Sequence, residues 1–452
     1  MIKVTQMKFA PFFRSAALVT AVALLPATTA GLAQVEGKAA PEFGKLFAIY
    51  QRIKANYVEP VDDETLIHGA IDGMLAALDP HSAYLDGEAL ARIETMIDGN
   101  YEGLGISVTM DDGAVKVISP MKGSPAEKAG VKAGDFITHL DGELIYGLSL
   151  DEAVSKMRGP AGTSLRLSIF RAGHGDPFDI SVVRGVIELE PVTHELQAGK
   201  IGVISVNEFS KDVGEDVRKA VETMRREAGG GTLNGIVLDL RNNPGGSLDE
   251  AVELSDLFLD SGEIVSQRGR VRAENVVFDA ETVFPGDVAA GVPLIVLINV
   301  GSASASEIVA GALQDHHRAL IMGERSFGKG SVQSLMMLTR DSALKLTTAR
   351  YFTPSGRSVQ EGGINPDIRV PQLSDPDAAR RAKFAVRESD LRRHLINEIK
   401  LDDQELENDE VQDPRFKATP EELEKQGIKD FQLNYALETL RRTSGTALAG
   451  RQ

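Results

Sequence analysis

The sequence predicts an α/β protein (α+β in its outer parts) in which a β-rich module precedes the main sheet and helical segments lie at both ends. Three observations support this fold class. Apolar strands alternate with helices over residues 188–372, short β-rich runs separated by Gly, Pro and Asp turns occupy residues 99–187, and helical periodicity marks residues 34–98 and 373–452. A chain of 452 residues is too long for one ordinary core, so several domains are expected.

The N-terminal segment, residues 1–33, predicts a secretory signal peptide. Three basic residues precede the apolar run 16–30, and small residues before Gln34 offer a cleavage site after Ala33. The alternative is an uncleaved membrane anchor, but a spanning helix needs about 20 apolar residues, more than this run provides. We therefore expect export to the periplasm or cell envelope, with membrane association only if the segment is retained.

Charge and cysteine content exclude several kinds of function. The net charge is −17, and loss of residues 1–33 would remove three basic residues and no acidic ones. Such a surface repels nucleic acid and anionic lipid headgroups, so neither is expected as a partner. The chain has no cysteine, which rules out a thiol nucleophile, a disulfide framework and a thiolate metal site.

Residues 34–98 are predicted to be helical. Apolar side chains recur every three or four residues from Phe43 to Tyr57 and again from Leu66 to Leu78. The second helix is expected to end at the Asp-Pro pair 79–80, since proline disfavours a helical conformation in the residue before it.

The module at residues 99–187 is predicted to form a peptide-binding groove. Its expected strands cover residues 105–109, 114–118, 136–140, 164–170 and 178–183, with helices at 125–129 and 150–158. The turn that opens it consists of Gly103, Leu104, Gly105 and Ile106. Its backbone N–H groups can hold a peptide's terminal carboxylate, while the strand edge pairs with the peptide backbone. Alone this is only a tight turn, but with the module in this order the segment resembles a PDZ domain.

The following region predicts a buried sheet. The runs 201–206, 235–240 and 292–300 are apolar enough to be covered on both faces. Helices are predicted between them at 213–226 and 248–259. Near the C-terminus an amphipathic helix is expected around residues 431–440.

A small-residue turn after the third of these strands holds the candidate nucleophile. It carries Ser302, Ser304 and Ser306 ahead of a helix predicted from residue 306 to 314. Ser306 can serve as the cap of that helix, whereas Ser304 lies between two alanines and is the least shielded. We therefore favour Ser304.

Two groups of backbone amides can stabilise an oxyanion beside this serine. The amide of Ala305 lies at the predicted helix start, where it can face developing negative charge. Gly245 and Gly246 follow the strand 235–240 and can present bare amides to a cleft at its carboxyl end.

Lys329, in a glycine-flanked turn 25 residues after Ser304, is the candidate base. A neutral lysine amine can remove the proton of the serine hydroxyl, so the pair Ser304 and Lys329 predicts a Ser-Lys hydrolase. At its usual pKa of about 10.4 only about one lysine in 2,500 is neutral at pH 7. Burial must therefore lower that pKa by about three units, at a cost of about 4 kcal/mol. Gln333 lies about 13 Å further along an extended strand, so it can orient the amine only if the chain turns near Gly330.

Other interpretations of these residues are weaker. Residues 323–329 match most of a phosphate-binding loop, but Gly330 stands where magnesium binding needs Ser or Thr, and a strand is predicted to follow. The histidines at 316–317 lie a helix length, about 15 Å, from Ser304, too far for proton transfer. His81 is remote in sequence, and spacing alone leaves it open as a base.

Six segments together make the chain resemble the carboxyl-terminal processing proteases, also called tail-specific proteases, of bacteria and plastids. They are Leu78–Tyr84, Asp239–Gly246, Gly301–Glu307, Ser326–Gln333, Tyr351–Arg357 and Gly363–Asp367. The resemblance implies a core similar to the ClpP/crotonase architecture with an inserted PDZ domain. It also implies Ser304 as nucleophile, Lys329 as general base and Gln333 as the residue that positions the lysine.

The resemblance extends to the oxyanion hole, the partners and the control of activity. It implies an oxyanion hole formed by the Ala305 amide with an amide of Gly245 or Gly246, and it needs no metal or cofactor. It implies protein substrates with apolar C-termini, bound by a PDZ domain that gates the active site. An adaptor lipoprotein and a homo-oligomer paired through the terminal helices are also implied.

We therefore predict an exported serine endopeptidase that cleaves proteins at or near their C-terminal tails. Its predicted regions are a signal peptide at 1–33, an N-terminal helical segment at 34–98, a PDZ domain at 99–187, a Ser-Lys protease core at 188–372 and a C-terminal helical region at 373–452. One alternative is a PDZ-containing peptide-binding protein or chaperone with a silent peptidase site, although every catalytic residue type is present. Another is a trypsin-like PDZ protease, which would place its PDZ after the catalytic domain and use a Gly-Asn-Ser-Gly-Gly turn; this chain has neither.

Overall fold

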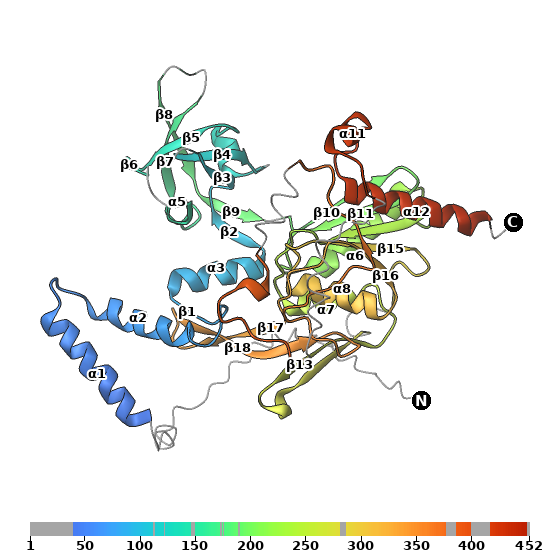
Figure 1. Cartoon of the computed structure of the whole chain (residues 1–452). Helices are drawn as coiled ribbons and strands as arrows, with labels where there is room; N and C mark the ends of the chain where they lie inside the picture. Colours follow the sequence, from blue (N-terminus) through green and yellow to red (C-terminus); the bar gives the residue numbers. More distant parts are fainter. Residues whose placement is uncertain are drawn as a thin grey trace, which may run out of the picture. The chain divides into compact units, whose positions relative to one another are not determined.

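The computed structural model describes residues 39–111, 114–121, 123–145, 150–171, 174, 176–188, 190–280, 286–376, 386–398 and 416–449 (Figure 1). The predicted signal peptide lies outside these residues. The chain divides into two units, one formed by Met1–Asp86 with Ser334–Leu346 and the other by Gly87–Gln333 with Thr347–Gln452.

The first unit contains two helices and a short strand, namely α1 (Ala39–Asn56), α2 (Asp63–Leu75) and β1 (Ala83–Leu85). Both predicted helices are confirmed. The side chain of Asp62 caps α2 by accepting from the Thr65 amide at 2.7 Å. The helix ends at Leu75, earlier than the proline at residue 80 requires, because the chain closes there in a tight turn. β1 pairs antiparallel with the first residues of β18.

The β-rich module in the second unit has the predicted order of strands and helices. It contains β3 (Ile106–Asp111), β4 (Ala114–Pro120), α4 (Pro125–Ala129), β5 (Phe136–Leu140), β6 (Glu143–Leu144), α5 (Leu150–Met157), β7 (Ser164–Phe170) and β8 (Phe178–Val183). Its antiparallel sheet has the order β3-β4-β5-β7-β8, with β6 paired to β5. Ser124 caps α4, Pro125 fills its first turn and Gly130 ends it at φ 91°, a conformation that glycine adopts without strain.

A separate pair of strands flanks this module at its two ends. β2 (Asn100–Gly103) follows helix α3 (Gly87–Asp98), and β9 (Gly185–Glu188) leads out of the module. The two strands pair antiparallel, with Gly103 opposite Gly185. The predicted start and end of the module therefore lie beside each other.

A six-stranded sheet forms the centre of the region after β9, in the order β10-β11-β12-β15-β16-β19. These strands are β10 (Val192–Gln197), β11 (Ile201–Val206), β12 (Gly235–Asp239), β15 (Leu294–Ile298), β16 (Ala319–Gly323) and β19 (Ile368–Arg369). All neighbours are parallel except β10 and β11. Every residue of β15 is buried, as expected for a parallel strand covered on both faces.

Helices cover the two faces of this sheet. On one face pack α6 (Val213–Glu227), α7 (Leu248–Asp256) and α8 (Ala305–Asp315). On the other face packs α12 (Phe431–Ala449), shown in red in Figure 1, which confirms the predicted C-terminal helix. Gly235 makes room for it, since a Cβ there would lie 2.9 Å from the Leu440 side chain.

The remaining elements belong to the second unit, except that residues 334–346 of β17, β18 and their connection belong to the first. β13 (Glu263–Gly269) pairs with β14 (Val276–Asp279) and with the later residues of β18 (Ala343–Phe352), and β17 (Ser331–Met337) also pairs with β18. The short elements are η2 (Arg272–Glu274), η3 (Glu388–Asp390) and α11 (Pro420–Lys425). The predicted helical region at 373–452 is corrected in one respect: residues 386–398 form turns and η3 rather than an α-helix, and several of their polar groups bond to Gln360.

Candidate active site

Three loops that carry the predicted site residues leave neighbouring strands of the parallel sheet at the same edge. They follow β12, β15 and β16, which lie side by side in that order. The first contains the glycine pair, the second the serines and the third Lys329. Carboxyl ends of adjacent parallel strands meet at one edge, so residues far apart in sequence are brought together there.

Hydrogen bonding separates the three candidate serines. The Ser302 hydroxyl donates to the Leu240 carbonyl at 2.8 Å, and the Ser306 hydroxyl donates to the Asn243 carbonyl at 2.9 Å. Both side chains are fully buried, so these two serines join the loop after β15 to the loop after β12. Ser304 lies between them, is only half-buried, and its hydroxyl makes no capping hydrogen bond to α8.

The backbone of Ser304 is strained. Its φ is 54° and its ψ is −111°, a conformation that a residue with a Cβ rarely adopts. Helix α8 begins at the next residue, Ala305. Strain of this kind costs about 1–3 kcal/mol and gathers at functional sites, where the surrounding structure enforces it. Ser304 thus lies in a strained turn between a strand and the N-terminus of a helix, an arrangement that presents a nucleophilic serine in other hydrolases.

Gly245 lies directly against this serine. Its φ is 105°, and a Cβ there would come within 2.8 Å of Ser304 Cβ and 3.1 Å of the Ala305 nitrogen. Its own amide donates to Asn243 Oδ1 at 2.9 Å. Gly246 faces the other way, since a Cβ on it would lie 2.3 Å from the Phe209 carbonyl oxygen. Of the two predicted glycines, Gly245 is therefore the one that borders Ser304 and Ala305.

A buried carboxylate joins the serine loop to the lysine turn, which we define as residues 326–330. Glu307 Oε2 accepts from the backbone amides of Ser304 at 2.8 Å and Lys329 at 3.0 Å. Its Oε1 accepts from the Ser326 hydroxyl at 2.5 Å and the Gly328 amide at 2.7 Å. The Glu307 side chain is therefore hydrogen-bonded to the backbone amides of both predicted catalytic residues, Ser304 and Lys329.

Burial dominates the electrostatics of Glu307. Its side chain is fully buried, which raises its pKa from 4.5 to about 7, although the four donors favour the ionised form and lower the pKa. The sequence analysis missed this residue. A serine followed three residues later by glutamate is the pattern of a capping box, and that signal could have identified one of its four contacts, the bond from the Ser304 amide.

Tyr351 provides a second connection between the two loops. Its buried hydroxyl lies between the carbonyl oxygens of Ser304, at 3.2 Å, and Lys329. Burial, with the nearby carboxylate of Glu307, raises the pKa of this phenol well above its usual value, so it remains a proton donor. Tyr351 opens one of the six segments that carry the resemblance, but its local sequence assigns it no role, because its partners lie 22 and 47 residues away.

Gln333 lies on β17, just after the lysine turn. Its Nε2 donates to the Ser331 hydroxyl at 3.0 Å and the Thr347 hydroxyl at 3.2 Å. For Gln333 to reach the lysine amine, the sequence requires a turn near Gly330; the residue with positive φ is Gly328 (97°), before Lys329, and β17 begins at Ser331. β17 follows this turn, so residues 323–329 do not open a helix as a phosphate-binding loop must.

Among the histidines considered as alternative bases, His316 has a structural role at the end of α8, away from Ser304. It is the C-terminal cap of α8, at the opposite end of that helix from Ser304, and its Nε2 lies 2.7 Å from the Glu263 carbonyl oxygen. His81 belongs to the first unit.

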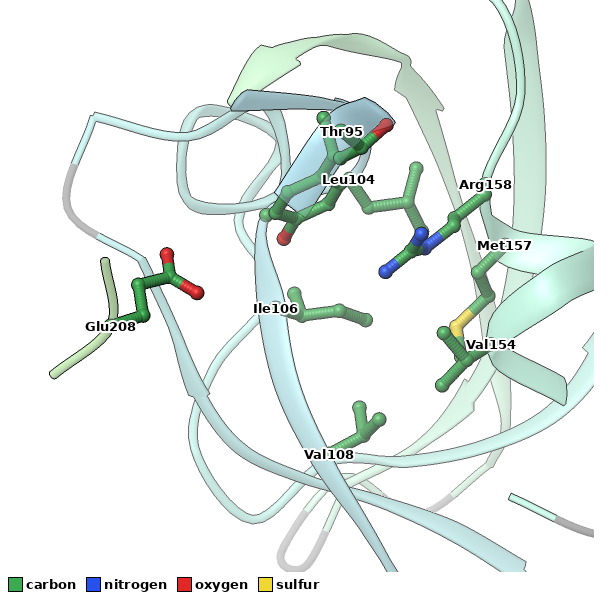
Figure 2. Close-up of a pocket in the computed structure, with 10 residues that line it drawn as sticks. Thr95, Leu104, Ile106, Val108, Val154, Met157, Arg158 and Glu208 are labelled. Atoms are coloured by element: carbon green, nitrogen blue, oxygen red, sulfur yellow. The ribbon is translucent and has the colours of Figure 1, made fainter. Parts of the chain in front are cut away.

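A groove of about 390 Å³ opens in the β-rich module. Figure 2 shows Ile106 and Val108 of β3 on one side and Val154 and Met157 of α5 on the other, with Arg158 at one end. The strand wall agrees with the strand edge that the sequence predicted for this groove, and α5 forms the facing wall. Of the predicted turn residues, Leu104, Gly105 and Ile106 line the groove, whereas Gly103 pairs with β9.

Glu208, from the loop after β11, also lines this groove. Burial raises the pKa of its carboxyl group. The next residue, Phe209, donates its amide to the Gly245 carbonyl at 2.9 Å, and its own carbonyl accepts from the Ser247 amide at 2.8 Å. Glu208, which lines the groove, is therefore followed directly in the chain by Phe209, a residue hydrogen-bonded to the loop that borders Ser304.

The residues that the structure describes offer neither a metal site nor a membrane-spanning helix. No group of three or more His, Asp or Glu side chains is arranged there to hold a metal ion. None of the described helices combines the length and apolar character that crossing a bilayer requires.

Comparison with known proteins gives consistent family matches. Residues 200–370 match peptidase family S41, residues 116–171 match a PDZ domain and residues 21–89 match the N-terminal domain of the activating protease CtpB. A carboxy-terminal-processing protease of Bartonella bacilliformis is 48% identical over 347 residues, covering 77% of this chain and 79% of that protein. The carboxy-terminal processing protease CtpA of Bacillus subtilis is 36% identical over 330 residues, covering 73% and 69%. Among solved structures, a photosystem II D1 C-terminal processing protease aligns with a TM-score of 0.44 at 28% identity, covering 77% of this chain and 92% of that one.

Proposed function

Because the chain belongs to the carboxy-terminal processing proteases of peptidase family S41, we propose that it cleaves exported proteins at or near their C-terminal tails with a Ser-Lys dyad. The family makes it a serine-type endopeptidase with a PDZ domain. The roles of individual residues, the gating by the PDZ domain and the location are our proposals.

The observation that carries the proposal is the strained, half-buried Ser304 between two serines whose hydroxyls are used structurally. Ser304 attacks the scissile carbonyl. The oxyanion that forms is stabilised by the amide of Ala305 and by an amide of Gly245 or Gly246. Gly245 lies close to Ser304, which supports a role for this loop; the Gly245 amide donates to Asn243 Oδ1 and must leave that acceptor to bind the oxyanion.

Lys329 is the general base in this mechanism. It takes the proton of Ser304 and returns it to the leaving amine, and water then resolves the acyl-enzyme. The shared Glu307 oxygen and the Tyr351 hydroxyl support a close placement of the two backbone positions. Gln333 positions the lysine from the start of β17.

The groove between β3 and α5 binds the substrate's C-terminus. Its apolar walls suit an apolar last side chain, and the guanidinium of Arg158 adds a positive charge that attracts a terminal carboxylate. Binding there raises the effective concentration of the tail at the active site. Glu208 lines the groove and the next residue, Phe209, is hydrogen-bonded to Gly245. This connection supports a mechanism in which a peptide bound in the groove changes the position of the loop that contains Gly245 and Gly246.

The cellular setting follows from the N-terminal segment and from the family. Residues 1–33 direct export to the periplasm or cell envelope, where they are cleaved or kept as an anchor. An adaptor lipoprotein and a second copy of the chain are the proposed partners. Nucleic acid is excluded by the net charge of −17.

One experiment tests the nucleophile and the base together. The protein lacking residues 1–33 and its variants Ser304→Ala and Lys329→Ala are incubated with envelope proteins, and new C-termini are identified by mass spectrometry. Lys425→Ala, which changes an exposed lysine, is the control. We expect new C-termini near the original tails with the parent and the control, and none with the other two variants. Undiminished cleavage by Ser304→Ala or Lys329→Ala would refute the dyad, and the former would favour a peptide-binding protein with a silent site.

A further inference from the structure

The lysine turn lies against a second segment of the chain, opposite Glu307. The Gly330 amide donates to the side-chain Oε1 of Gln360 at 3.0 Å, and the Glu361 amide donates to the Gly328 carbonyl at 2.9 Å. The contact is close along its length. A Cβ on Gly330 would lie 2.5 Å from the Gln360 nitrogen, and one on Gly328 would lie 2.7 Å from the Glu361 carbonyl oxygen. The position of Gln360 therefore sets the position of the turn.

Gln360 is itself held by residues 386–398, which we call the C-terminal strap. The amide nitrogen Nε2 of Gln360 donates to Glu388 Oε1 at 3.0 Å and to the Leu395 carbonyl at 2.8 Å. Asn397 Nδ2 donates to the Gln360 carbonyl at 2.6 Å. Gln360 and Glu388 are fully buried, so water cannot replace these partners without a change in packing.

The strap also contacts the lysine turn directly. The Glu388 amide donates to the Phe327 carbonyl at 3.3 Å, and the Arg387 guanidinium donates to the Ser326 carbonyl at 2.8 Å. On the neighbouring residue Glu361, the carboxylate binds His394 Nε2 at 2.7 Å. The strap is thus hydrogen-bonded both to the lysine turn and to residues 360–361, which contact that turn.

We propose that Gln360, fixed by the C-terminal strap, is a positioning residue for Lys329. The inference rests on the proposed role of Lys329 as base. A lysine side chain is long and flexible, so its amine can hold a productive distance from Ser304 only if its backbone is fixed. A misplacement of about 1 Å in such a group can cost about 100-fold in rate. The strap lies beyond residues 200–370, the part matched by the peptidase family, so the catalytic unit extends further along the chain than that match.

The decisive variant is Gln360→Met, which keeps the length of the buried side chain and removes its hydrogen bonds. We expect kcat for a peptide substrate to fall about 100-fold with KM within about twofold of the parent. We also expect the acid limb of kcat against pH to move to higher pH, because an amine released into water is harder to deprotonate. Partial unfolding would instead lower kcat by the same factor at every pH. The control Lys425→Ala changes an exposed residue outside the strap and should match the parent.

The outcomes separate this inference from the proposed function. An inactive Lys329→Ala together with a Gln360→Met variant of parental kcat and pH profile would overturn the inference alone. An active Lys329→Ala would overturn the proposed function itself. A fall in kcat for Gln360→Met without any change in the pH profile, accompanied by an equal fall in the folded fraction measured by circular dichroism, would also overturn the positioning role.

Discussion

Replacing Glu307 by glutamine should remove a pH-dependent part of the stability of this protease. The carboxyl group is fully buried and its pKa is raised from 4.5 to about 7, chiefly by burial. The folded protein therefore binds this proton more tightly than the unfolded chain does. Its contribution to stability is fully present below pH 4.5 and is lost as the pH rises through about 7.

The size of this effect follows from the shift. One pKa unit corresponds to about 1.4 kcal/mol, so the free energy of unfolding should fall by about 3 kcal/mol across this window. Glutamine does not titrate, and its amide group would face backbone donors of Ser304 and Lys329 or of Gly328, so Glu307→Gln should also lose most of its kcat.

Denaturant unfolding at pH 4.5, 6 and 8 provides the measurement. The difference in unfolding free energy between the parent and Glu307→Gln should change by about 3 kcal/mol over this range. Glu424→Gln, at an exposed position, is the control and should follow the parent. If the parent and Glu307→Gln keep the same pH dependence, the carboxyl group does not titrate in this window and the argument from burial fails.

Three further predictions concern the same region. Gly245→Ala should lower kcat about 100-fold while the protein remains folded, because the new alanine Cβ would lie 2.8 Å from the Ser304 Cβ. Steady-state kinetics measure kcat and circular dichroism measures the folded fraction. Normal turnover by this variant would contradict the prediction. Ser302→Ala should lose about 1–3 kcal/mol of stability yet retain cleavage, whereas Ser304→Ala should be folded and inactive; thermal melts and peptide cleavage distinguish them. Asp430→Asn should weaken the ion pair with Arg241 and cost about 1 kcal/mol at pH 7. Burial opposes ionisation of Asp430, but Arg241 keeps its pKa below the usual range, so this difference should vanish on strong acidification, and a constant difference would refute the assignment.

Much of the fold could be predicted because its signals are local. The alternating strands and helices of both domains follow from apolar runs and turn residues, and α4 begins and ends at the serine, proline and glycine that mark it. The strand before Ser304 and the strand before Gly245 were also recognisable, so both could be placed at carboxyl ends of strands.

Other features depended on contacts that no local pattern records. Residues 386–398 are charged and were predicted as helical, but their polar groups bond to Gln360 and to the lysine turn, and those bonds outweigh helix propensity. Glu307 and Tyr351 were missed for the same reason, since their partners belong to other loops.

By itself the sequence determined the family and predicted most strands and helices of the β-rich module and the central sheet, with Ser304 and Lys329 as candidates, because each of these rests on local motifs and apolar runs. Only the tertiary structure decided how the lysine turn is held. That turn is bound by Glu307 from one side and by Gln360 and residues 386–398 from the other, and buried hydrogen bonds between such distant segments exist only once the sheet has brought them together.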